Sequence, residues 1–273
     1  MAMGDGRYAP AATMIGLVQR GRGLGARMAE ENPVAAAELV YGCVRWDWRW
    51  APGDQRALYL ARLVRDLALP LGPVVDLLAG EKDVCERAVG VLELLALDGS
   101  AQAREALRAY VRDGEHRVVA VEPVAAPPSA RARPEAPAER GAEEDVPALV
   151  AGLERDWVER TWCGPVDTAR GLARFGSGAR DAVSLLRRFW LWTPHSYERV
   201  GYLEALAEID PTGLDEVYVE CLWDCEDDAR LLGVRRAPDG PAVRERLAYL
   251  RDDPLEAPEV GAAAGQRLAA PTP

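Results

Sequence analysis

The sequence has very little lysine, histidine and phenylalanine. Among 273 residues there is one lysine, Lys82, with two histidines and two phenylalanines, and nearly all of the positive charge is arginine. The 33 basic side chains are outnumbered by 44 acidic ones, which gives a net charge of −11. A protein that grips nucleic-acid phosphates draws most of its affinity from a basic surface. We therefore expect no nucleic-acid partner.

Histidine and cysteine also fail to form a motif for catalysis or metal binding. His116 and His195 have neither metal-ligand nor triad spacing. The five cysteines are an odd number without disulfide-like clustering, as is typical of a reducing compartment. Cys221 and Cys225 lie four residues apart, but two thiolates alone make a poor metal site. We expect no catalytic residue, no cofactor and no metal ion.

Long apolar runs are missing as well. The run from Met14 to Val18 is too short for the core of a secretory signal or for a membrane span. We expect a cytoplasmic monomer without a membrane partner. Because 49% of the residues are hydrophobic, the chain can still bury one extended core or two small ones.

What the sequence does contain is an internal repeat. Arginine opens four segments of matching pattern, two weaker copies fit between them, and 31 residues separate the members of each strong pair. The repeat arginines are Arg56, Arg87, Arg117, Arg170, Arg199 and Arg230. Apolar residues follow at helical spacing, and amphipathic segments precede the copies at residues 33–44, 73–78, 100–111, 179–190 and 212–222. This pattern predicts an all-α chain of about six helical hairpins, which must stack as an α-solenoid to bury their apolar stripes.

Residues 81–88, EKDVCERA, combine an acidic turn with the arginine of the following helix. This combination and the hairpin length resemble HEAT repeats of the short, lyase-like bacterial kind. Residues 14–111 are also similar to actinobacterial HEAT-repeat proteins. The resemblance implies an armadillo-type solenoid and a scaffold for protein–protein interaction. It supplies no catalytic residues, because HEAT motifs carry none.

A stretch rich in proline and alanine divides the array. Residues 122–145 contain five prolines and no apolar periodicity, which predicts a flexible linker. One HEAT-like block would span residues 14–121 and a second one residues 146–253. Residues 1–13 and 254–273 are expected to be disordered ends.

The hexapeptide RWDWRW at residues 45–50 concentrates three tryptophans at the end of the first predicted hairpin helix. Trp46 can continue that helix, whereas Trp48 and Trp50 fall in the hairpin corner. The indoles either close the end of the helical stack or form an exposed anchor for a partner, since tryptophan and arginine are enriched at binding hot spots. Stacking on nucleic-acid bases is a third possibility, which the net charge opposes.

The leading functional hypothesis is a non-catalytic adaptor that binds a protein or peptide along a groove lined by the second helices. Counting from the repeat arginines places five side chains opposite the buried stripes, where we expect them to be exposed. They are Tyr59, Arg62, Asp66, Glu93 and Tyr202. Together with Trp46, Trp48 and Trp50 they are the candidate partner-binding residues.

The alternative hypothesis is an enzyme. Some bacterial HEAT-like solenoids excise alkylated DNA bases with tryptophans and a carboxylate, and Trp46, Asp47 and Trp48 could imitate that trio. Such an enzyme needs a basic groove to hold DNA. Here acidic residues alternate with the arginines, so this hypothesis is disfavoured.

The repeat arginines each open a helix beside an acidic turn. Asp54 precedes Arg56, Asp83 precedes Arg87, and Glu226 precedes Arg230. A guanidinium there would bridge consecutive hairpins through partly desolvated ion pairs. We expect Arg87→Ala to strand a carboxylate and to cost about 2–3 kcal/mol of stability.

The glycine-rich segment RGRGLGAR at residues 20–27 evokes a loop that cradles phosphate. No strand precedes it, so it fails the contextual test for a dinucleotide fingerprint. We expect Arg20, Arg22 and Arg27 to lie on a solvated helix face.

Overall fold

The computed structural model describes residues 8–47, 55–114 and 142–270. Within these ranges every regular element is a helix, which confirms the all-α prediction. The first half contains α1 (Met14–Gln19), α2 (Gly23–Glu31), α3 (Pro33–Arg45), α4 (Arg56–Asp66), α5 (Gly72–Val75), η2 (Asp76–Ala79), α6 (Lys82–Leu97) and α7 (Ala101–Gly114). The second half contains η3 (Glu143–Asp145), α9 (Val146–Glu159), α10 (Pro165–Ala173), η4 (Gly176–Ala182), α11 (Val183–Trp192), η5 (Ser196–Glu198), α12 (Arg199–Ile209), α13 (Asp215–Cys221), α14 (Asp227–Arg236), α15 (Pro241–Asp252) and α16 (Pro258–Ala269).

Helix starts follow the local chemistry of the sequence. The Asn32 side chain accepts the N–H of Ala35 at 3.3 Å, and Pro33 occupies the first position of α3, where a missing N–H costs nothing. The Thr13 side chain caps α1 in the same way by accepting the N–H of Gly16 at 3.2 Å. Two repeat arginines, Arg56 and Arg199, are the first residues of α4 and α12.

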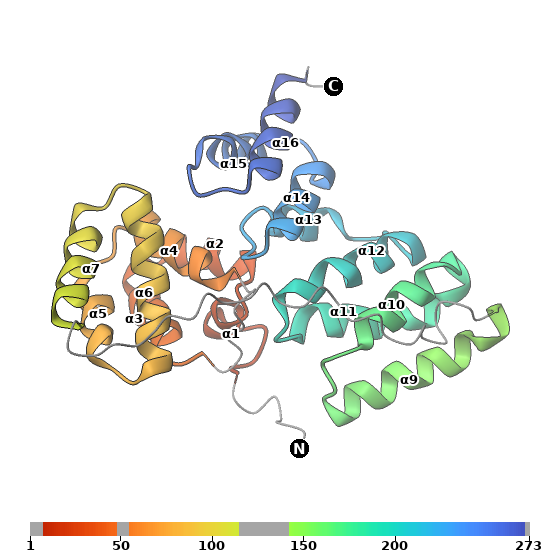
Figure 1. Cartoon of the computed structure of the whole chain (residues 1–273). Helices are drawn as coiled ribbons and strands as arrows, with labels where there is room; N and C mark the ends of the chain where they lie inside the picture. Colours follow the sequence, from red (N-terminus) through yellow and green to blue (C-terminus); the bar gives the residue numbers. More distant parts are fainter. Residues whose placement is uncertain (1–7, 48–54, 115–141, 271–273) are drawn as a thin grey trace.

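The helices pack mainly against near neighbours in the chain, and the two halves lie side by side (Figure 1). In the first half, α4 packs between α3 and α6, and α7 covers α6. In the second half, α12 contacts α10, α11 and α14, while α16 covers α14 and α15. Helices α1 and α2 lie between the halves, and α2 contacts α13.

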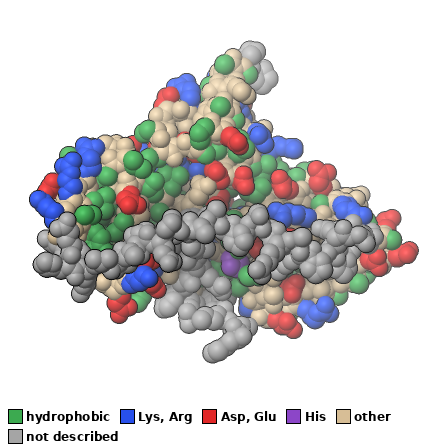
Figure 2. Space-filling model, viewed as in Figure 1, with side chains coloured by type: hydrophobic (Ala, Val, Ile, Leu, Met, Phe, Trp, Pro, Cys, Tyr) green, Lys and Arg blue, Asp and Glu red, His purple; other side chains and the backbone are tan. Residues whose placement is uncertain are grey.

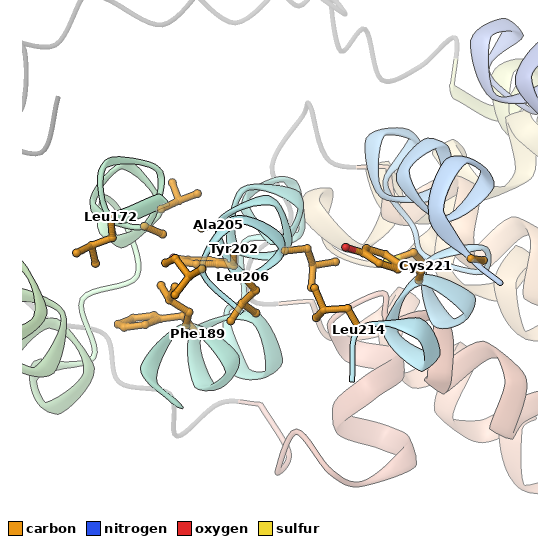
Figure 3. Close-up of a cluster of buried hydrophobic side chains, with 14 of the residues drawn as sticks. Leu172, Phe189, Tyr202, Ala205, Leu206, Leu214 and Cys221 are labelled. Carbon is orange, nitrogen blue, oxygen red and sulfur yellow. The ribbon is translucent and has the colours of Figure 1, made fainter. Parts of the chain in front are cut away.

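Two buried hydrophobic clusters form the core. The larger one is built from α9 to α16, and its central members are packed between α10, α11, α12 and α13 (Figure 3). Phe189 and Tyr202 stack there, with ring centroids 5.7 Å apart. The other cluster is built from α1 to α7 but also includes Cys225 of the second half. One core therefore crosses the boundary between the halves.

The expected disorder of residues 254–273 is wrong for residues 258–269. Residues 258–269 form α16, in which Val260 and Ala264 are buried against α14 and α15. Proline at the first turn and an alanine-rich sequence favour a helix. The buried pair at i and i+4 is a helical stripe of small side chains, which is harder to recognise than a stripe of leucines.

The expected disorder of residues 1–13 is wrong from Tyr8 onward. The side chain of Ala11 is fully buried, and the hydroxyl of Tyr8 accepts a hydrogen bond from Arg56 at 2.9 Å. Arg20 adds a cation–π contact, with its guanidinium carbon 4.9 Å from the centre of the Tyr8 ring. Most of the predicted linker lies outside the described residues, and its last residues, Glu143–Asp145, form η3.

Candidate functional site

The glycine-rich segment at residues 20–25 is a junction between the two halves. The carbonyl oxygen of Gly21 accepts the N–H of Cys225 at 2.9 Å, and Gly21 has a φ of +66°, a region that favours glycine. A Cβ on Gly23 would lie 1.9 Å from the carbonyl oxygen of Glu220, in α13. The glycines therefore allow two backbones to touch, and no phosphate is needed to explain them.

Two arginines in this segment are buried rather than solvated. Arg22 forms an ion pair with Glu220 across the junction, with its Nε 2.6 Å from Oε1, and its guanidinium carbon lies 3.8 Å from the Trp190 ring centre. Arg20 donates hydrogen bonds to the carbonyl oxygens of Trp192, Ala9 and Gly16. Each arginine thus replaces its hydration shell with fixed acceptors, which a buried guanidinium requires.

The strong copies of the repeat arginines are also buried. Arg56, Arg87, Arg199 and Arg230 are each less than a tenth exposed. Arg170, a weaker copy, is exposed with its side chain 3.5 Å from Asp167, and Arg117 lies outside the described residues. The repeat pattern therefore marks a buried position in its strong copies.

The acidic partner of Arg230 differs from the predicted Glu226. Arg199 pairs with Asp224, and Arg230 pairs with Glu256, which follows α15. Arg56 pairs with Asp47, while its predicted neighbour Asp54 lies outside the described residues.

Arg87 pairs with no carboxylate of the described residues and instead binds backbone at the end of α3. It donates to the carbonyl oxygens of Val44 and Arg45, each at 2.8 Å, which a helix end leaves unpaired. Arg87→Ala therefore leaves no carboxylate unpaired, and the cause predicted for its destabilising effect is wrong.

The predicted exposed groove is wrong for three of its five side chains. Tyr59, Arg62 and Tyr202 are buried, while Asp66 and Glu93 are exposed. Helices α4 and α12 are packed on more than one side, so the face opposite the first apolar stripe meets another helix rather than solvent. The hydroxyl of Tyr59, for example, donates to the carbonyl oxygen of Arg22 at 2.9 Å across that second face.

Trp46 is the one tryptophan of RWDWRW that the structure describes. It caps the end of α3 and is 61% exposed, which agrees with an anchor more than with closure of the stack. Trp48 and Trp50 lie outside the described residues. Asp47 of the proposed base-excision trio is engaged elsewhere, because its carboxylate lies 2.9 Å from Arg56 and accepts the hydroxyl of Tyr8.

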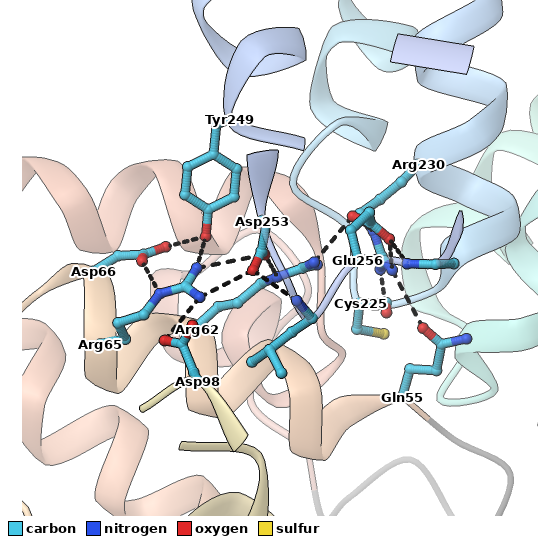
Figure 4. Close-up of polar contacts among 12 residues, drawn as sticks. Gln55, Arg62, Arg65, Asp66, Asp98, Cys225, Arg230, Tyr249, Asp253 and Glu256 are labelled. Carbon is cyan, nitrogen blue, oxygen red and sulfur yellow. Dashed lines mark hydrogen bonds and ion pairs between the residues drawn. The ribbon is translucent and has the colours of Figure 1, made fainter. Parts of the chain in front are cut away.

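The structure brings Arg62 and Asp66 together with side chains that the sequence pattern did not single out (Figure 4). Arg62 pairs with Asp253 at 2.8 Å and with Glu256 at 3.0 Å. Asp66 accepts the hydroxyl of Tyr249 at 2.7 Å. Because α4 belongs to the first half and α15 to the second, we name this cluster, with Arg65, the α4–α15 surface.

Arg65 links the two helices of the α4–α15 surface. Its guanidinium contacts the carboxylates of Asp66, Asp98 and Asp253 and donates to the hydroxyl of Tyr249. Burial, with the charge of Asp66, raises the pKa of Tyr249 to about 12, so the phenol stays neutral and can donate. Apart from Asp66, these partners lie at least 33 residues from Arg65 in the chain, and no local motif could have indicated them.

Two further residues extend this surface toward α2. The indole N–H of Trp223 donates to the carboxylate of Glu30 at 3.1 Å. The guanidinium carbon of Arg246, in α15, lies 4.7 Å from the ring centre of Trp223 and 4.0 Å from that of Tyr249. Burial raises the pKa of Glu30, and the charge of Arg246 opposes that shift.

Lowering the pH should destabilise the α4–α15 surface, because it protonates the carboxylate of Asp253. Burial opposes the charge of this carboxylate, but the hydrogen bond from Arg65 and the charge of Arg62 outweigh it and lower its pKa. A lowered folded-state pKa adds stability that is fully present above the unfolded value, about 3.9, and is lost as the pH falls through the folded value. Urea unfolding between pH 7 and pH 2 should show wild type losing more stability than Asp253→Asn; parallel curves would contradict this assignment.

Cys163 is the one exposed cysteine of the five, and none of the five forms a disulfide bond. Its Sγ lies 3.4 Å from Nε2 of His195, a contact between residues 32 apart that sequence spacing did not indicate. We expect a thiol-reactive dye to modify one cysteine per folded chain quickly and all five only after denaturation. Fast modification of a second thiol, or a Cys163→Ser variant that still reacts fast, would contradict the burial of the others.

Neither a metal centre nor a membrane span is found in the part of the chain that the structure describes. No group of three or more histidine, cysteine, aspartate or glutamate side chains there is arranged to hold an ion. None of the helices there combines the length and the apolar content that crossing a membrane requires. Comparisons with protein-family models, with curated proteins and with solved structures find no match to this chain.

Proposed function

We propose that this chain is a non-catalytic adaptor, a solenoid of HEAT-like helical hairpins that binds a protein or peptide on the α4–α15 surface. The order of packing supports the solenoid, since α10 contacts α12, α12 contacts α14 and α14 contacts α16. In such an array each hairpin buries its stripe against the next one and presents a rigid extended surface.

The composition of the α4–α15 surface is the reason for proposing it as the binding site. The α4–α15 surface gathers arginine, tyrosine and tryptophan side chains, the types that dominate binding hot spots, and holds them by ion pairs from both halves. Asp66 and Glu30 at its edge are exposed. Fixed side chains lose little conformational entropy when a partner binds, so such a surface is preorganised.

Selection from a random peptide library on the intact chain tests this function. We expect a family of related peptides whose affinity falls at least about tenfold with Asp66→Ala, because a charge-assisted hydrogen bond contributes about 1.5–3 kcal/mol. Glu93→Ala, on the exposed face of α6, is the matched control and should bind normally. Absence of enriched peptides, or equal losses in the two variants, would exclude this surface as the binding site.

Duplex DNA is not the expected ligand. Figure 2 shows acidic and basic side chains interspersed over the visible face of the described residues, and the net charge is −11. A gel-shift titration at low salt should show no complex at micromolar protein. Tight binding there would instead favour a DNA-directed activity.

A further inference from the structure

Arg246 differs from the other buried arginines in what surrounds its charge. Its residue is 7% exposed, and its Nε donates to the carbonyl oxygen of Leu222 at 3.2 Å. The guanidinium also makes cation–π contacts with the rings of Trp223 and Tyr249. Arg62, Arg199 and Arg230, which are similarly buried, all have a carboxylate within 3.0 Å. Arg87 lacks a carboxylate but donates to two carbonyl oxygens at 2.8 Å, so Arg246 has fewer acceptors than any of these.

No described carboxylate pairs with Arg246, and its two terminal nitrogens have no hydrogen-bond partner among residues 8–47, 55–114 and 142–270. Both terminal nitrogens are accessible to solvent. Burial lowers the pKa of Arg246, and the positive charge of Arg62 adds to this effect. These terminal N–H groups have no partner in the described residues but remain open to solvent, so they are available to an acceptor from outside the chain.

We propose that Arg246 anchors a carboxylate-binding site, in which its two terminal nitrogens hold a carboxylate of the bound peptide as a bidentate pair. This inference rests on the proposed function and names the chemistry of its ligand. The planar fork of arginine matches the two oxygens of a carboxylate, and the ring faces hold the fork in place. The carboxylate comes from an acidic side chain or from the free end of a peptide.

The surroundings favour a carboxylate over a phosphate. Glu30 and Asp66 lie close enough to act on the charge of Arg246, although neither contacts it. Two nearby negative charges oppose a doubly charged phosphate more strongly than a singly charged carboxylate. The indole of Trp223 borders the site through both Arg246 and Glu30, so its N–H resonance reports on binding there.

The test follows the Trp223 indole resonance of the intact chain, assigned with Trp223→Phe, during titration with four probes. Acetyl-Ala-Phe offers a terminal carboxylate, acetyl-Glu-Phe-amide a side-chain carboxylate, acetyl-Ala-Phe-amide neither, and inorganic phosphate the competing anion. We expect saturable shifts with at least one of the carboxylate peptides and a response at least about tenfold weaker with the neutral amide and with phosphate. Equal responses to the neutral amide, or tighter binding of phosphate, would overturn the proposal.

Two variants test whether the Arg246 side chain is responsible for binding the carboxylate peptides. Arg246→Gln should weaken binding of the carboxylate peptides at least about tenfold, whereas Arg251→Gln, an exposed arginine on the same helix, should not change it. Should Arg246→Gln fail to fold, Arg246→Lys keeps the charge without the fork and should also bind more weakly. Library peptides that bind the α4–α15 surface without any carboxylate would refute this inference and leave the proposed function intact.

Discussion

Arg199→Ala is expected to lower the free energy of unfolding by about 3–5 kcal/mol, because it leaves a buried carboxylate without its partner. Arg199 is 1% exposed and lies 2.6 Å from Asp224, which is itself buried. Its guanidinium also donates to the carbonyl oxygens of Arg20 and Gly21 in the other half of the chain. The substitution therefore removes both an ion pair and contacts across the junction. Urea unfolding followed by circular dichroism measures the loss.

The matched control is Arg170→Ala, which removes the corresponding arginine of another repeat copy. The Arg170 side chain is 57% exposed, so its pair with Asp167 should contribute no more than about 1 kcal/mol. The double variant Arg199→Ala/Asp224→Ala should be less destabilised than the sum of the single changes, since no unpaired charge remains. Similar losses for Arg199→Ala and Arg170→Ala would show that burial of the pair does not matter.

Gly23→Ala should destabilise the chain by about 3 kcal/mol, the upper end for an overpacked site. The added Cβ would lie 1.9 Å from the carbonyl oxygen of Glu220 and 2.9 Å from its carbonyl carbon. Both atoms are backbone, so rotation of a side chain cannot relieve the clash. Helix α2 must move away from α13, which also weakens the pair between Arg22 and Glu220.

Gly42→Ala in α3 is the control for this prediction. No heavy atom lies within 4 Å of a Cβ at Gly42, so the substitution meets open space. An alanine in a helix is more favourable than a glycine by about 0.5–1 kcal/mol, and we expect stabilisation by about that amount. Thermal melts compare the two variants, and a Gly23→Ala chain that melts with wild type would show that the halves do not touch at this point.

Local features of the sequence were enough to predict several of the helices, but not α16. Proline at Pro33 and the spacing of apolar residues after Arg56 and Arg199 agree with helices in the structure. The acidic turn predicted before Arg87 is wrong, because α6 already begins at Lys82 and Arg87 lies inside it. These features depend on residues within one or two turns of each other, and such short-range patterns can be recognised in a single sequence.

The contacts between the halves could not be predicted in the same way. Arg22 and Glu220 are 198 residues apart, and nothing near either one identifies the other. Tyr59 and Tyr202 were expected to be exposed because the helical stripe accounts for one packed face only, whereas both helices are packed on further sides. Arg246 carried no sequence pattern at all, because its environment is made by rings from α15 and from the segment after α13.

The proposed surface exists only if the two halves fold as one unit, because α4 and α15 come from different halves. Scanning calorimetry of the intact chain tests this requirement most directly. We predict a single transition in which the calorimetric and van't Hoff enthalpies agree, since buried pairs such as Arg22–Glu220 and Arg62–Asp253 join the halves. Two separate transitions, with Gly23→Ala leaving both unchanged, would contradict it.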